Sequence, residues 1–314
     1  MKLKLLIITV LALCLGGTVM AQQDKIITNY MYDQMSINPG ETGINDGICA
    51  TTIYRNQWDK VSRAPNSTLL NVEANMNRFF PGGIGISFYA DRIGFTAQNS
   101  VLLNYSYPLE LTGYGVLGIG VGVGIMNYGY NPLWEPPQQG TVGIDQTLPD
   151  SWSATGLDLN FGLFFKGDAD YYVGLSATHL SETAIESKTS VTNDDYSSKR
   201  HYYIMGGKVF RGIGPGDIKA DAIVRTDFAK ATVELTGRYL WNNFAYGGIG
   251  VRTTEYASIL LGVKPLPDLT VGYSYDITMN KLAGISRGSH EILLKYCFYL
   301  PPPPVQKSKH PRWL

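Results

Sequence analysis

The sequence predicts an all-β fold: an antiparallel, membrane-crossing β-barrel of about 14 strands with short periplasmic turns and longer extracellular loops. Apolar and polar residues alternate over strand-length segments between residues 46 and 299. Glycine (35 residues) and tyrosine (21 residues) are abundant, while only 17% of residues are charged. Beyond residue 21, no apolar run approaches the roughly 18 residues that a membrane helix needs. Strands with one face in lipid and the other in a wet lumen produce this mixture.

The first 21 residues have the features of a secretory signal peptide. Lys2 and Lys4 precede a long apolar run, which ends in a small-residue cleavage site at residues 19–21. Cys14 raises the alternative of a lipoprotein leader, although Leu13 is larger than the small residue that usually precedes a lipidated cysteine. We therefore expect residues 1–21 to be a cleaved signal peptide.

The expected strands follow one another along the chain. Their approximate ranges are 46–56, 66–77, 82–92, 95–108, 115–128, 151–165, 170–180, 198–208, 216–227, 230–241, 244–254, 256–265, 268–278 and 287–299. In the last strand, one face carries an apolar row that ends on aromatic residues: Ile292, Leu294, Tyr296 and Phe298. The opposite face carries Glu291, Leu293, Lys295 and Cys297. Charged residues facing inward fit a barrel with a polar lumen better than a soluble sandwich.

The connections support this arrangement. With the N-terminus in the periplasm, the two longest connections, 129–150 and 181–197, fall at the extracellular end. Every connection at the periplasmic end is short. Outer-membrane barrels show this asymmetry, so we expect a multi-pass protein of the bacterial outer membrane.

Two segments flank the barrel, which spans residues 46–299. Residues 22–45 lack clean alternation and are expected on the periplasmic side or inside the lumen. Residues 300–314 begin with a proline run, which favours an extended polyproline II arm, and end in a basic stretch. We expect this tail in the periplasm.

Two cysteines remain after cleavage of the leader. Cys49 and Cys297 lie in the first and last expected strands, which become neighbours when a barrel closes. A disulfide across that seam is geometrically possible. Two small buried thiols are the favoured interpretation.

A glycine series occupies one face of the strand at 115–128: Gly118, Gly120, Gly122 and Gly124. It lacks the spacing of a phosphate-binding loop, and no helix pattern follows it. A bare inner face either relieves the curvature of the wall or lets a plug or a passing polypeptide approach closely. Relief of curvature is the favoured interpretation.

The sequence predicts neither an enzyme nor a cofactor or metal site. Ser289 and His290 are consecutive on a strand, so they project to opposite faces and cannot form an activated pair. The other histidines have no metal-ligand spacing. Without Lys2 and Lys4, the chain has 24 basic and 26 acidic residues, a balance that gives no nucleic-acid footprint.

The first strand ends in a polar and aromatic stretch. Tyr54 and Trp58 are expected to anchor the barrel at the membrane interface, with Arg55 turned inward. Asp91 and Gly94 belong to a tight outer turn, as their turn chemistry indicates.

Several motifs have an order and spacing that resemble the PorP/SprF family of type IX secretion system membrane proteins of Bacteroidetes. They run from Tyr30-Met31 and Asn38-Pro39 through Tyr54 to Trp58 and Gly82 to Gly94, and end with Gly272 to Asp276 and Gly288 to Phe298. The motif residues are Asn38, Pro39, Tyr54, Arg55, Trp58, Asp91, Gly94, Tyr273, Tyr275, Asp276, Gly288, His290 and Glu291. Two departures are the sequence Gly40-Glu41-Thr42-Gly43, where the family usually has Ala-aromatic-Ala-Gly, and the Pro-rich tail.

The resemblance implies a non-enzymatic barrel that helps cargo proteins with C-terminal sorting domains, such as gliding adhesins, to reach or stay on the cell surface. Other type IX components, including periplasmic ones, are implied partners. The exposed residues Trp134, Pro136 and Pro137 of the loop 129–150 are candidate cargo contacts. The alternative function is that of a passive porin, since a barrel of this size can enclose an aqueous lumen.

Overall fold

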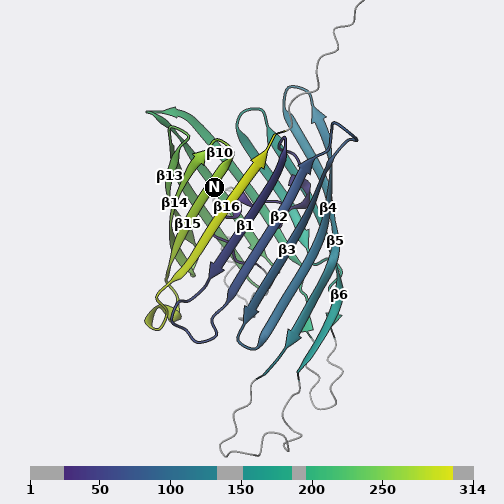
Figure 1. The fold of residues 1–314 in the computed structure, drawn as a ribbon, viewed down its shortest axis with the longest axis vertical. Coiled ribbons are helices and arrows are strands. Elements are labelled where there is room, and N and C mark those ends of the chain that lie inside the picture. The colour runs from purple at the N-terminus through teal and green to yellow at the C-terminus, as the bar shows by residue number, and fades with distance from the viewer. Residues whose placement is uncertain (1–24, 133–150, 186–195, 300–314) are drawn as a thin grey trace, which may run out of the picture.

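The computed structural model describes residues 25–132, 151–185 and 196–299, which form a closed antiparallel barrel (Figure 1). Its strands are β1 (Ile48–Asn56), β2 (Asn66–Asn75), β3 (Gly83–Ile93), β4 (Thr96–Leu111), β5 (Gly115–Tyr130), β6 (Trp152–Gly167), β7 (Tyr171–Thr178), β10 (His201–Ile213), β11 (Gly216–Thr226), β12 (Ala231–Trp241), β13 (Ala245–Arg252), β14 (Tyr256–Leu266), β15 (Leu269–Thr278) and β16 (Ser289–Phe298). Each strand pairs with the next, and β1 pairs with β16. The predicted fold class and the number of 14 strands are therefore confirmed.

The strand boundaries differ from the predicted ones mainly in the centre of the sequence. Strands β4, β5 and β6 each have 16 residues and extend beyond their predicted ranges. Two further strands of two residues each, β8 (Ala184–Ile185) and β9 (Tyr196–Ser197), pair with each other in the connection 181–197, where no strand was predicted. Strands this short are too brief to show an alternating pattern.

The two faces of the wall follow the predicted alternation. On β16, Ile292 and Leu294 point outward and are 53% and 43% exposed, whereas Glu291 and Leu293 are fully buried inside. The strands β4, β11 and β12 show the same opposition. An apolar outer surface of this kind is suited to lipid. None of the helices in the described part of the chain is long and apolar enough to cross a membrane.

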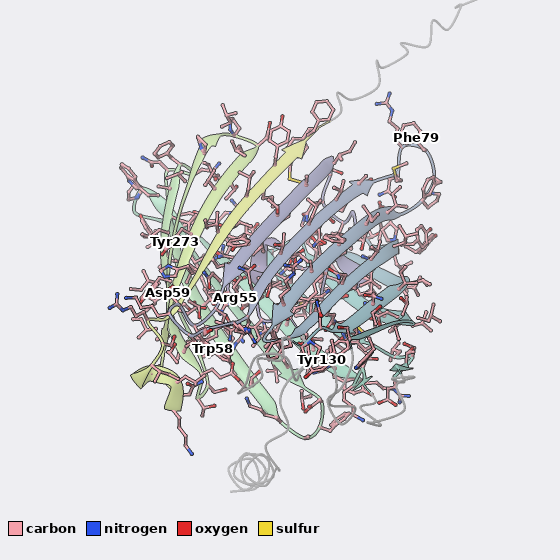
Figure 2. All side chains as sticks on the ribbon, turned by 60° about the horizontal axis from the view of Figure 1, so that its bottom comes forward. Arg55, Trp58, Asp59, Phe79, Tyr130 and Tyr273 are labelled. Atoms are coloured by element: carbon pink, nitrogen blue, oxygen red, sulfur yellow. A yellow bond between two sulfur atoms is a disulfide. The ribbon has the colours of Figure 1, made fainter. Side chains whose placement is uncertain are left out.

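The two ends of the barrel differ in the length of their connections. At one end, turns such as 112–114, 214–215 and 242–244 are short. At the other end lie the long connections 131–151 and 179–200. Figure 2 shows Phe79 at the short-turn end and Trp58 towards the long-loop end. Because periplasmic turns of outer-membrane barrels are short, the short-turn end faces the periplasm.

The core of the molecule lies inside the barrel, because the segment 25–45 fills the lumen. This segment, called the plug below, contains the short 3-10 helices η1 (Tyr30–Tyr32) and η2 (Pro39–Glu41). A third, η3 (Lys281–Gly284), lies in the loop before β16. Tyr30 and Ile37 of the plug pack against four inward side chains from the three strands β6, β10 and β11: Phe164, Tyr203, Met205 and Ile223. The barrel wall and the plug therefore share one hydrophobic core.

A disulfide joins the first and last strands. Cys49 and Cys297 are register partners of β1 and β16, and their Cα atoms are 4.0 Å apart. The favoured expectation of two free thiols is therefore wrong. The reason is the register in which the barrel closes, because it places the two residues directly opposite each other at the seam.

Candidate functional site

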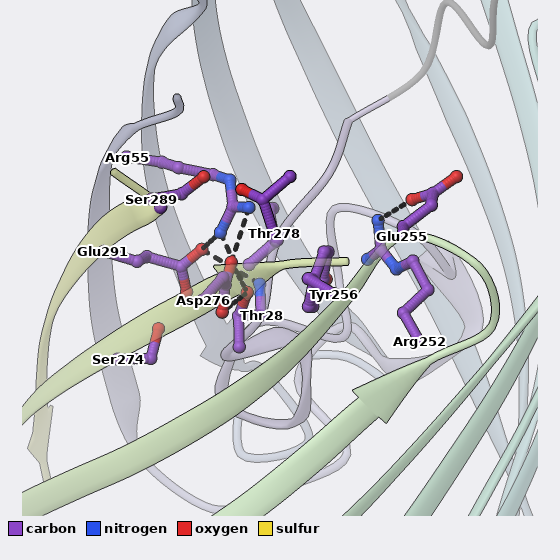
Figure 3. A network of polar contacts seen from close by, with 12 residues as sticks. Thr28, Arg55, Arg252, Glu255, Tyr256, Ser274, Asp276, Thr278, Ser289 and Glu291 are labelled. Carbon is purple, nitrogen blue, oxygen red and sulfur yellow. Dashed lines mark hydrogen bonds and ion pairs between the residues drawn. The ribbon is translucent and has the colours of Figure 1, made fainter. Parts of the chain in front are cut away.

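A buried ionic cluster ties the wall of the barrel to the start of the plug (Figure 3). Arg55 on β1 contacts Asp276 on β15 at 2.6 Å and Glu291 on β16 at 3.0 Å. All three side chains are at most 2% exposed. Asp276 and Glu291 lie on the paired strands β15 and β16, and closure of the barrel brings the distant Arg55 to them.

The plug supplies the remaining hydrogen bonds of this cluster. The backbone N–H groups of Thr28 and Asn29 donate to the carboxylate of Glu291 at 2.9 and 2.7 Å. The hydroxyl of Thr28 donates to Asp276 at 2.8 Å and accepts from the guanidinium of Arg55 at 2.8 Å. Removing one partner from such a buried set typically costs 3–5 kcal/mol, because it leaves an unpaired charge. The cluster therefore acts as a lock on the plug.

A second cluster lies beside the first. Glu234 on β12 accepts from Arg225 at 3.2 Å and from Arg252 at 2.7 Å, and all three are buried. The ring of Tyr256 lies between the two clusters, with the guanidinium groups of Arg55 and Arg252 at 5.7 and 4.6 Å from its centre. The carboxylate of Glu255 also accepts from Arg252, as the dashed line in Figure 3 marks. The two clusters thus form one continuous polar belt along the inner wall from β11 to β1, across one half of the barrel.

The motif residue Asn38 fixes the second half of the plug. Its side-chain oxygen accepts from the N–H of Gly40 at 2.9 Å, which caps η2 ahead of Pro39. Its amide donates to the carbonyl oxygens of Leu163 on β6 and Leu175 on β7 at 3.0 and 3.3 Å. Because the Asn38 side chain hydrogen-bonds to the plug and to the wall, it holds the plug against β6 and β7.

The glycine series on β5 makes room for this part of the plug. A Cβ atom at Gly118 would overlap the carbonyl oxygen of Gly40, and one at Gly120 would overlap Pro39. The favoured interpretation of relief of curvature is therefore wrong for these two positions. Close approach of the plug explains them. A Cβ at Gly40 would itself lie 2.8 Å from the backbone nitrogen of Phe164, which gives a structural reason for the departure from alanine there.

Other motif residues lie on the outer side of the wall. The hydroxyl of Tyr273 is 2.6 Å from Nδ1 of His290, and Tyr275 donates to the carbonyl of Arg287 at 2.5 Å. Gly288 immediately precedes β16 and has a φ of +93°, a conformation that favours glycine. Ser289 points inward, opposite to His290, as predicted, so these two residues form no catalytic pair.

The residues expected at the outer rim divide between membrane and lumen. Tyr54 is 44% exposed on the outer face, as expected for an interfacial anchor. Trp58 is half-buried instead: its backbone N–H donates to Ser289, and its side chain lines a cavity inside the mouth of the barrel. Asp91 lines the same cavity, and Gly94 occupies a turn with a φ of +63°.

That cavity, called the outer cavity below, opens at the long-loop end and has a volume of about 560 Å³. Trp58, Tyr128 and Tyr256 are among its walls, and Ile26 of the plug contributes from below. The candidate cargo contacts Trp134, Pro136 and Pro137 lie outside the described residues.

Sequence reasoning missed the plug residues of the lock, because Thr28 and Asn29 carry no recognisable motif. It also treated the histidines as scattered. The structure brings His179 and His201 together, with ring centres 6.2 Å apart, and places Asp158 at 3.0 Å from His179. In the described ranges, no group of three or more His, Cys, Asp or Glu residues could hold a metal ion.

The fold and the lumenal lock define a plugged, multi-pass β-barrel of the outer membrane. The chain belongs to the PorP/SprF family of type IX secretion system membrane proteins, whose family model matches residues 19–296. This is a family of secretion-system membrane proteins and not of enzymes. Among curated proteins, none matches the chain.

Solved structures support the barrel fold alone. The Ralstonia pickettii toluene transporter TbuX is 11% identical, with a TM-score of 0.51, over 84% of this chain and 93% of the transporter. The P. putida toluene transporter TodX is 9% identical, with a TM-score of 0.50, over 84% of this chain and 93% of that chain. At such low identity, the likeness carries no statement about ligands.

Proposed function

We propose that this barrel binds type IX cargo at its long-loop end and supports the secretion or surface attachment of proteins with C-terminal sorting domains, such as gliding adhesins. In this proposal the lumen is a scaffold and not a route for the cargo. The observation that carries it is the locked plug inside the lumen, which leaves the outer cavity open at the long-loop end.

The plug argues against the alternative of a passive porin. Tyr30 and Asn38 of the plug are fully buried, and the plug bonds to β1, β6, β7, β15 and β16. Before water could fill the lumen as it does in a porin, the hydrophobic and ionic contacts between the plug and the wall would have to break. A steady conductance of the wild-type protein in a planar bilayer would favour the porin instead.

The chemistry of the outer cavity suits a protein segment. Aromatic residues such as Trp58 and Tyr128 supply apolar contact area, and polar residues such as Gln57 and Gln98 stand beside them. Aromatic residues are enriched at protein interfaces for this combination of area and polarity. The loop 129–150, with Trp134, Pro136 and Pro137, leaves the wall at this same end and would extend the surface.

Periplasmic type IX components are the second class of partner in this proposal. They would meet the barrel at its short-turn end, where the tail 300–314 also leaves the last strand.

Cargo display tests the main proposal. We expect deletion of 129–150 to abolish surface display of a reporter fused to a C-terminal sorting domain, while the barrel still folds. A matched pair addresses the cavity: Gln57→Trp fills it and should lower display, whereas Gln57→Ala leaves it open and should not. Unchanged display in both the deletion and Gln57→Trp would refute cargo binding at this end.

A further inference from the structure

Three inward-facing lysines lie near the short-turn ends of their strands: Lys166 on β6, Lys219 on β11 and Lys264 on β14. We call this set the basic mouth. The ammonium of Lys166 donates to Asn45 of the plug at 2.7 Å, and that of Lys264 donates to Asn243 at 2.9 Å. Both acceptors are neutral. Within the part of the chain that the structure describes, none of the three lysines has a carboxylate partner.

Lys219 is the least satisfied member. It is half-buried and has neither a hydrogen bond nor an ion pair among the described residues. Its register partner on β12 is another cation, Arg238, and like charges directly opposite each other destabilise a sheet. Asp221 forms its ion pair with Arg238 at 2.6 Å. Lys219 has no ion pair of its own: Arg238, Lys264 and Arg211 repel it, and only Asp221 attracts it from a distance. The wall thus keeps an unpaired cation at a position where it costs stability.

Lys166, Lys219 and Arg238 line one cavity, which has a volume of about 220 Å³ and is bounded on the inside by Gln34 and Glu41 of the plug. A water molecule in liquid occupies roughly 30 Å³, so the cavity corresponds to about seven waters. One or two carboxylate side chains therefore fit in it.

The acidic residues that line this cavity are already engaged. Asp221 accepts from Arg238 and from the hydroxyl of Tyr172. Asp170, in the turn before β7, pairs with Arg211. Glu41 accepts a hydrogen bond from the side-chain amide of Asn45 at 3.0 Å, and burial, together with the nearby carboxylate of Glu73, raises the pKa of Glu41 well above its usual value, which disfavours its charged form. None of these acids is left to neutralise the lysines, and the cavity is cationic.

The geometry points to a docking site for an acidic peptide segment of a periplasmic protein, with a carboxylate seated against Lys219. Lipid headgroups do not fit this site, because the lysines face the lumen. A single small anion does not span it either. Lys166 and Lys264 lie six strands apart in the order of the barrel, which is about 29 Å along the wall at about 4.8 Å per strand.

This inference rests on the part of the proposed function that gives the barrel periplasmic partners. It explains why an unpaired cation is retained: a group kept for binding often lowers the stability of the unbound protein. A chain of carboxylates laid across the mouth would pair Lys219 and then reach Lys166 or Lys264.

The test uses the full-length protein in detergent micelles and a fluorescein-labelled peptide of six glutamates, with a peptide of six glutamines as the reference. We expect the acidic peptide alone to bind, and to bind more weakly as salt is raised. Lys219→Gln should weaken binding at least tenfold and raise the unfolding temperature, since it removes a repulsion. Lys219→Arg should retain most of the binding. Lys60→Gln, a charge-matched control in an exposed outer loop, should bind as the wild type does.

Two results would overturn the site. One is unchanged binding by folded Lys219→Gln. The other is displacement of the peptide by sodium phosphate at the same charge concentration, which would mean a site for small anions. The broader proposal has its own readout, co-purification of the tagged barrel with periplasmic type IX components. If the wild-type barrel does not bind the acidic peptide but still co-purifies with periplasmic type IX components, this site alone is refuted. If the wild-type barrel binds the peptide but does not co-purify with those components, only the proposed partners are refuted.

Discussion

Cys49 on β1 lies directly opposite Cys297 on β16, and a disulfide joins them across the seam where the barrel closes. The two residues are 248 positions apart in the sequence. Cross-linking residues that far apart removes conformational entropy from the unfolded chain, and the chain-entropy relation gives about 5 kcal/mol for such a loop. The bond therefore stabilises the one strand pair that no local turn can help to form.

Loss of this disulfide should destabilise the barrel. We expect Cys297→Ser to lower the free energy of unfolding by about 2–5 kcal/mol, measured from the urea midpoint of the heat-modifiable band on a gel. Cys49→Ser breaks the same bond, so the double variant should lose no more than either single variant. A double variant that loses about twice as much would mean that each thiol acts by its own packing.

The ionic lock should control the conductance of the barrel. Arg55→Ala leaves Asp276 and Glu291 as unpaired buried carboxylates, so we expect a loss of about 3–5 kcal/mol in the docking of the plug. Released from the lumen, the plug would uncover a pore, and planar bilayers should show steps of current that the wild type lacks.

The matched control for the lock is an exposed ion pair. Arg211→Ala breaks the contact between Arg211 and Asp170, and the Arg211 side chain is 65% exposed. Exposed pairs contribute little to stability because water screens them, so this variant should stay closed in the bilayer. A closed Arg55→Ala barrel, with normal folding on the gel, would refute the role of the lock.

Much of the wall could be predicted from the sequence, because alternation is a local signal. The outward position of Ile292 and the inward position of Glu291 depend only on period two and on lipid outside the barrel. What Glu291 contacts could not be predicted in this way. Its partners Arg55 and Thr28 are more than 230 residues away, and their approach depends on closure and on a plug without periodicity.

The same limit explains the two corrections. A sequence shows that Cys49 and Cys297 lie in neighbouring strands, but only the register decides whether their sulfur atoms meet. Likewise, the strand face without side chains at Gly118 and Gly120 indicates that another segment can approach the wall closely, but it does not identify that segment. The occupant is Pro39-Gly40 of the plug, a contact that no local pattern encodes.

Side chains on the glycine face should expel the plug. Gly120→Val places atoms where Pro39 now lies, and we expect overpacking to cost at least about 1–3 kcal/mol and to open the pore in bilayers. Gly237→Ala is the control, since nothing lies within 4 Å of a Cβ there. Deleting the plug, residues 25–45, should make Gly120→Val harmless to folding. A persistent folding defect would place the clash within the wall itself.

Docking of the plug should strengthen as the pH falls from 7 to 5. Burial raises the pKa of Asp33 in the plug to about 6, against hydrogen bonds from Ser36 and Asn71 and the charges of Lys25 and Lys295, which lower it.

The sign follows from proton linkage. A carboxyl with a raised pKa binds its proton more tightly in the docked state, so docking weakens as the pH rises through 6 and is most favoured below the ordinary value of 3.8. Between pH 7 and pH 5, this one group changes the docking equilibrium about tenfold. Using the Arg55→Ala variant, in which opening is frequent enough to count, the open probability should fall on acidification. Adding Asp33→Asn should flatten that response, and an unaltered pH dependence would assign it to another group, such as Glu41.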